Sequence, residues 1–139
     1  MSTYNAAVEV QSVVEGFETC TTDKAAFTHR DHLTVAVCYL QDATIEEATA
    51  KLRTALLRFV DHHNVDRQKY NETITVFWLE LVTEELKKLP AEASVVNKCN
   101  AVIDSLNNSG LALEYYSAEL LFSQGARESF VAPDLKSWR

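Results

Sequence analysis

Glycine and proline are scarce in this chain, which holds three glycines and two prolines among 139 residues. Both residues are typical of the many turns of a β-sandwich or β-barrel, so their scarcity argues against these folds and favours helices joined by short loops. Hydrophobic residues make up 47% of the sequence, enough for one domain with a substantial core at this length. We therefore expect a single all-α domain over residues 1–139.

The chain also has little positive charge. Thirteen Lys and Arg residues stand against twenty Asp and Glu, a formal net charge of −7. Nucleic acids and anionic membrane surfaces bind proteins through basic stripes, so neither is expected as a partner. No apolar stretch approaches the roughly 20 residues that span a bilayer. The N-terminus lacks the basic region and apolar run of a signal peptide. The three cysteines at unpatterned spacings favour reduced thiols, which predicts a cytoplasmic protein.

Apolar residues recur at helical spacing in five segments of the sequence. Thr28 and Thr44 are predicted N-caps, and each is followed three residues later by an acid, as in a capping box. Pro90 ends one segment, and Gly110 is expected to adopt a left-handed conformation after the last. The predicted helices cover about 5–20, 28–40, 44–63, 70–89 and 92–107. The pattern therefore predicts a five-helix up-and-down bundle, with short helical turns in the C-terminal tail packed against it.

Three of the four histidines lie on the apolar side of predicted helices. His29 and His32 begin the second helix, His63 ends the third, and Glu72 lies at the start of the fourth. Short loops make consecutive helices antiparallel neighbours, so these helix ends are expected at one end of the bundle. Inward-facing titratable groups are costly unless they are paired or ligated, which makes this group a candidate site.

Three segments also carry a family resemblance. They are Thr-His-Arg-Asp-His-Leu at 28–33, Tyr-Asn-Glu-Thr-Ile-Thr at 70–75, and a tail over 115–134 with Tyr-Tyr-Ser, Ala-Arg and Pro-Asp. Together they resemble an uncharacterised family of small bacterial helical proteins with Thr-His-x-x-His-Leu and Tyr-His-Glu-Thr-x-Thr segments. The resemblance covers about 27–134 and implies no activity. The chain departs from it at Asn71, where the family pattern has histidine. If that histidine were a ligand or base, the site of this chain would be weakened or would use His63 instead.

One interpretation of the polar group is a metal site. Histidines three residues apart on a helix can reach one ion, and a further histidine and a carboxylate complete a set suited to zinc or iron. The predicted ligands are His29, His32, His63 and Glu72. An open coordination position would activate water for hydrolysis or hold a group of the substrate. The Glu-x-x-His pairs typical of di-iron bundles are absent from the sequence.

A second interpretation is a metal-free pocket for a small molecule. His32 or His29 would act as general acid or base, with Glu72 orienting it or accepting a proton from the substrate. The start of the second helix would favour an anionic ligand through its free N–H groups and its dipole. Tyr115 and Tyr116 of the tail are expected to form a lid over this pocket. Further candidate ligand contacts are Tyr70, Thr75 and Arg127.

A third interpretation gives the cluster no ligand. His29 would then help to cap its helix, His32 would hydrogen-bond a tyrosine, and Glu72 would serve the first turn of its own helix. The protein would be a non-catalytic interaction module that binds a protein partner. Separately satisfied histidines and a large exposed apolar patch would favour this alternative. The sequence leaves open whether the protein is an enzyme.

Overall fold

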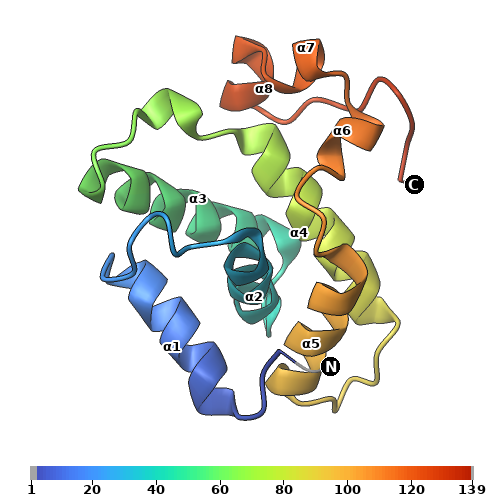
Figure 1. Ribbon diagram of the computed structural model, residues 1–139. Helices are drawn as coiled ribbons and strands as arrows, with labels where there is room; N and C mark the ends of the chain where they lie inside the picture. Colours follow the sequence, from blue (N-terminus) through green and yellow to red (C-terminus); the bar gives the residue numbers. More distant parts are fainter. Residues whose placement is uncertain (1–2, 139) are drawn as a thin grey trace.

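The computed structural model describes residues 3–138, and every regular element in this range is helical, which confirms the all-α prediction. The five predicted helices are all present (Figure 1): α1 (Ala7–Glu18), α2 (His29–Leu40), α3 (Ile45–His62), α4 (Glu72–Lys87) and α5 (Val95–Leu106). The shorter elements are a 3₁₀ turn, η1 (Arg67–Lys69), and the predicted short tail helices α6 (Ala112–Tyr115), α7 (Ala118–Leu121) and α8 (Gln124–Glu128). The up-and-down order of the five helices stays a prediction.

Capping residues explain where the helices begin. At α3, the Thr44 hydroxyl accepts a hydrogen bond from the Glu47 N–H at 3.1 Å, and the Glu47 carboxylate accepts one from the Thr44 N–H at 2.9 Å. At α2, the Thr28 N–H donates to the Asp31 carboxylate at 3.2 Å. Both starts agree with the capping-box pattern. The prediction for Gly110 is wrong, because no glycine of residues 3–138 has a positive φ; α5 ends earlier, after Leu106.

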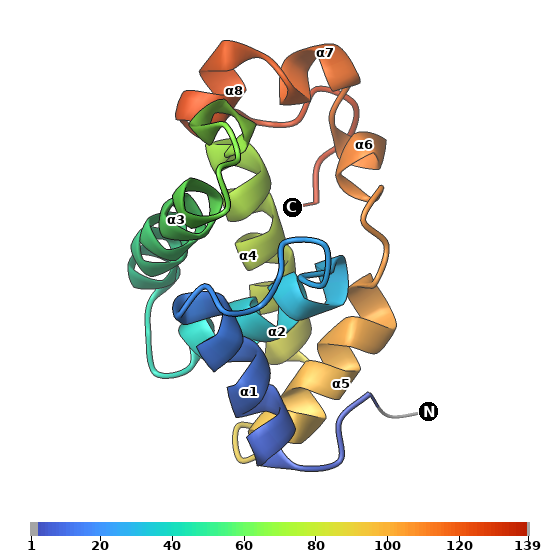
Figure 2. The ribbon, with the colours of Figure 1, turned by 60° about the vertical axis from the view of Figure 1, so that its left-hand side comes forward.

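Helix α2 lies in the middle of the fold and packs against α1, α3, α4 and α5. Figures 1 and 2 show these four helices around it. Its polar face is covered as well as its apolar face. Thr34 is fully buried, and its hydroxyl lies 2.8 Å from the hydroxyl of Tyr4 in the N-terminal segment. The sequence pattern of α2 alone gives no sign of this cover, because it comes from a residue thirty positions away.

The C-terminal tail is held by the first turn of α4. The Asn71 amide donates to the Leu121 carbonyl at 2.8 Å, and the Thr73 hydroxyl donates to the Ala126 carbonyl at 2.7 Å. The Val131 N–H donates back to the Thr73 hydroxyl at 3.2 Å. Both views place α7 and α8 beyond this end of α4 (Figures 1 and 2). The tail therefore packs on the bundle as expected, through these buried hydrogen bonds and through buried side chains such as Leu121 and Tyr116.

None of the helices in the described range has the length and apolar character to cross a membrane. The prediction that no signal peptide is present also concerns Met1 and Ser2, which lie outside the described residues.

Candidate functional site

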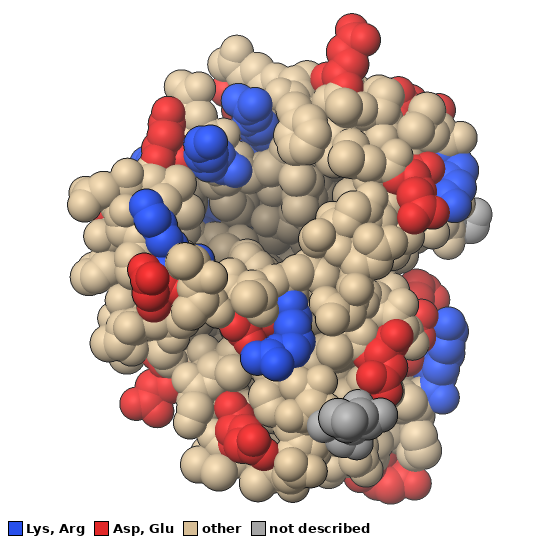
Figure 3. Space-filling model, in the orientation of Figure 1, with Lys and Arg blue, Asp and Glu red and all other residues tan. Residues whose placement is uncertain are grey.

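A cavity of about 440 Å³ opens between α2, α3 and the start of α4. Pockets for small molecules commonly have volumes of about 300–1,000 Å³. Figure 3 shows its mouth as a hollow in the middle of one face of the molecule. Its walls include residues from both predicted motifs, since the 28–33 segment begins α2 and the 70–75 segment begins α4.

His32, in the first turn of α2, lines the cavity. The residue is exposed, and part of its surface faces the cavity. The Phe27 ring packs on the His32 ring with centroids 4.4 Å apart. Within residues 3–138, neither ring nitrogen has a hydrogen-bond partner. Burial lowers the pKa of His32 to about 4, helped by the neighbouring His29 and opposed by Asp31, so the imidazole is neutral near neutral pH.

His29 lines the same cavity one turn earlier on α2. Its Nε2 lies 3.1 Å from the Leu106 carbonyl at the end of α5. A carbonyl only accepts, so Nε2 carries the hydrogen and Nδ1 keeps its lone pair. Its ring packs edge-on against Trp78 with centroids 4.5 Å apart. Burial lowers the pKa of His29, and the Leu106 hydrogen bond opposes this shift. The cavity thus contains two histidines that favour the neutral form.

Glu72 lies next to the cavity but does not line it. Arg53 of α3 binds its carboxylate with two hydrogen bonds, at 2.9 and 2.5 Å. The Tyr70 hydroxyl donates to the same carboxylate at 2.6 Å. The bonds from Arg53 hold the pKa of Glu72 below its usual value against the effect of burial. Burial and then the bond to Glu72 raise the pKa of Tyr70, so Glu72 is an ionised anchor and Tyr70 a neutral wall residue.

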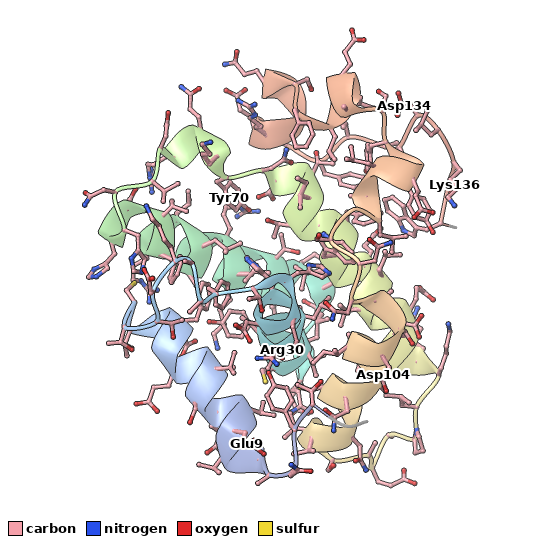
Figure 4. The ribbon with its side chains drawn as sticks, in the orientation of Figure 1. Glu9, Arg30, Tyr70, Asp104, Asp134 and Lys136 are labelled. Carbon is pink, nitrogen blue, oxygen red and sulfur yellow. The ribbon has the colours of Figure 1, made fainter. Side chains whose placement is uncertain are left out.

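Arg53 was missed by reasoning from sequence. It belongs to a segment of alternating charges that is typical of a solvated helix face. Its partner Glu72 lies on another helix, so no local signal in the sequence points to this pairing. Tyr70, labelled in Figure 4, lies between α3 and the start of α4, where its hydroxyl links the cavity wall to this ion pair.

Two more polar residues line the cavity near the start of α4: Thr75, which was predicted as a ligand contact, and Lys69, which was not. Thr75 lines the cavity, and its hydroxyl donates to the Asn71 carbonyl at 3.1 Å. Lys69 also lines it, and this exposed side chain makes no ion pair with any residue of the described range. Lys69 is therefore the one fully charged side chain among the described residues that line the cavity.

His63 lies outside the cavity, although it ends α3 as predicted. Its ring packs against Phe59 with centroids 4.4 Å apart, and Phe59 in turn packs against Phe27 at 5.2 Å. Phe27 is the ring that covers His32. A chain of aromatic contacts thus connects the two histidines without bringing them to one site. The His63 Nε2 atom is buried and has no hydrogen-bond partner.

The four residues predicted as metal ligands do not form one ligand group. Two of them, His29 and His32, line the cavity, while Glu72 is paired with Arg53 and His63 lies elsewhere. Across residues 3–138, no cluster of three or more His, Cys, Asp or Glu side chains is placed to hold a metal ion. Binding of zinc or iron by this set stays a prediction that their placement does not support.

The tail residues predicted as ligand contacts also lie outside the cavity lining. Tyr116 is fully buried, and its hydroxyl donates to the Val131 carbonyl at 2.6 Å. Tyr115 packs on Phe77 with centroids 5.4 Å apart, and Arg127 lies on α8. The α5–α6 connection reaches the cavity instead, through Ser109.

Comparison with protein-family models, with curated proteins and with solved structures found no match for this chain. The family resemblance of the motifs therefore stays a prediction, and the functional argument depends on the cavity itself. Asn71, which stands where the resembling family has histidine, is the N-cap residue of α4. The Asn71 side-chain oxygen accepts from the Ile74 N–H at 3.0 Å, a role that asparagine performs well.

Proposed function

We propose that the protein binds a small organic molecule in the cavity between α2, α3 and α4, and that His32 contacts it. The observation that carries this proposal is the state of His32, which lines the cavity, is exposed and makes no hydrogen bond within the described range. Three other polar side chains that line the cavity, His29, Tyr70 and Thr75, have hydrogen-bond partners within the protein. Because His32 lines the cavity and its ring nitrogens are not bonded within residues 3–138, they are free to hydrogen-bond to a ligand that enters it.

A neutral imidazole suits this role because it offers one N–H donor and one lone pair. It also supports acid–base chemistry, in which His32 takes a proton from the bound molecule or returns it. Glu72 would act on such a step through Tyr70, because its own carboxylate is occupied by Arg53. We therefore assign His32 to direct contact with the ligand and Glu72 to positioning.

The competing function, a protein-interaction module, has one observation in its favour. Four of the five exposed large hydrophobic side chains belong to the tail: Leu113, Phe122, Phe130 and Leu135. These exposed side chains do not explain why a histidine without a hydrogen-bond partner faces an open cavity, so ligand binding is the function we propose.

Two adjacent leucines of α3 provide a matched test. Leu56 lines the cavity, whereas Leu57 belongs to a shallow depression on another face of α3. With octan-1-ol as a neutral probe, we expect saturable NMR shifts at cavity residues. L56W should weaken this binding by about tenfold or more because the indole fills the space, and L57W should leave it within about twofold. Absence of saturable binding, or equal effects of the two variants, would contradict the proposal.

A further inference from the structure

We propose that the cavity selects an amphipathic organic anion, a free small acid with an aliphatic body and one carboxylate. This inference rests on the proposed function, since it specifies the chemical class of the molecule that the same cavity binds.

The aliphatic body is inferred from the walls that α3 and α4 contribute. From α3, the side chains lining the cavity are all aliphatic: Leu52, Leu56 and Val60. From α4, Ile74 and the indole of Trp78 continue this surface. An apolar body placed against these side chains removes apolar surface of both partners from water, which favours binding.

The polar part of the cavity comes from the helix start and the connections rather than from α3. The first turn of α2 supplies His29 and His32, the segment before α4 supplies Lys69 and Tyr70, and the α5–α6 connection supplies Ser109. In Figure 4, Tyr70 marks this wall between α3 and the start of α4. The cavity therefore has an apolar side and a polar side, as a molecule with an apolar body and one polar head group requires.

The charge of the head group is inferred from which ionised groups line the cavity. Lys69 lines it, and no Asp or Glu does within the described range, although the chain has a net charge of −7. The adjacent carboxylates are already engaged, Glu72 by Arg53 and Asp31 by the Thr28 N–H. Figure 3 shows walls without acidic side chains and Lys and Arg side chains on the upper left rim of the hollow. A cationic ligand would meet Lys69 without a compensating carboxylate, whereas an anion would be attracted.

Binding of an anion should also change the protonation of His29 and His32. The titratable groups that face His32 are His29 and Asp31, with Lys69 on the same cavity wall. Burial lowers the pKa of both histidines, and a carboxylate placed beside them would favour their protonated forms. Binding of an anion should therefore be accompanied by uptake of protons, which binding of a neutral analogue is not.

Three probes with the same alkyl chain test the head group on the full chain: octanoate, octan-1-ol and octylammonium. By calorimetry near neutral pH, we expect octanoate to bind about tenfold more tightly than octan-1-ol, and octylammonium to bind most weakly. K69Q should weaken octanoate binding by about fivefold and leave octan-1-ol binding within about twofold. K98Q makes the same charge change at the start of α5, at the opposite end of that helix from Leu106, and should affect neither probe.

The outcomes separate this inference from the proposed function. If octan-1-ol binds in a manner sensitive to L56W but octanoate binds no more tightly, the anion class is wrong and the proposed function stands. If none of the three probes binds, both are wrong. Vesicles of phosphatidylglycerol present the same chemistry, an anionic group on an aliphatic body, as a membrane surface; the protein should stay in the supernatant when they are pelleted, and its appearance in the pellet would overturn the assignment to a free acid.

Discussion

His32 and His63 each have a ring nitrogen without a hydrogen-bond partner in the described residues, but their surroundings differ. The Nε2 atom of His63 is buried beside Phe59, where no ligand can reach it without a change in packing. His32 faces a cavity that opens to solvent, so a partner for its nitrogens can arrive from outside. His32 packs on Phe27, and His63 packs on Phe59. Helical spacing alone does not determine which of the two histidines faces the cavity.

The first residue-scale prediction concerns pH. The pKa of His32 is about 4 in the folded protein, below its ordinary value of 6.5, so the unfolded chain binds more protons between these values. The free energy of unfolding should therefore decrease as the pH falls from about 6.5 towards 4. Urea unfolding near pH 7 and near pH 5 measures the decrease, and H32Q should make it smaller.

His62 provides the control for that comparison, because it is an exposed histidine at the end of α3. H32Q should reduce the pH dependence of stability by more than H62Q does. An H32Q variant with the same pH dependence as the unmodified protein would show that His32 is not held in its neutral form.

At the scale of elements, α3 and α4 are joined by the ion pair between Arg53 and Glu72, and Tyr70, which lines the cavity, donates to the same carboxylate. E72Q keeps an acceptor for the Tyr70 hydroxyl and removes the charge that Arg53 binds. Hydrogen bonds to charged groups commonly contribute about 1.5–3 kcal/mol, and Arg53 is partly exposed. We therefore expect E72Q to reduce the free energy of unfolding by about 1.5 kcal/mol, measured by urea denaturation.

The matched control for this pair is Glu84, whose ion pair with Lys87 lies at the exposed end of α4. E84Q should cost less than about 0.5 kcal/mol, as surface pairs usually do. If E72Q costs no more than E84Q, the link between α3 and α4 is not the anchor that the geometry suggests.

The helix starts could be predicted from the sequence, whereas the contacts between helices could not. The starts of α2 and α3 follow from Thr28 and Thr44, because a capping box is made within four consecutive residues. The burial of Thr34 depends on Tyr4, and the state of Glu72 depends on Arg53. These pairings join residues far apart in sequence, so local spacing does not reveal them. Gly110 was predicted wrongly because a glycine after a helix permits a left-handed turn without requiring one.

At the scale of the whole molecule, the candidate site is a product of packing around α2. The sequence argument expected the starts of α2 and α4 to lie close together, which agrees with His29, His32, Tyr70 and Thr75 lining one cavity. The sequence argument also placed His63, Tyr115, Tyr116 and Arg127 near this site, but the structure shows them elsewhere. Which residues at one end of a bundle actually share a cavity depends on how several helices fill space together, and only a three-dimensional structure supplies this.

The most direct test of the central claim uses the four histidines as reporters within one molecule. His29 and His32 line the cavity, whereas His62 and His63 do not. Imidazole NMR resonances recorded during a titration with octanoate should shift for His29 and His32 with one common saturation curve, while those of His62 and His63 stay in place. Unchanged resonances for His29 and His32, or larger shifts at His62 and His63, would contradict the account that this cavity is where the protein binds its ligand.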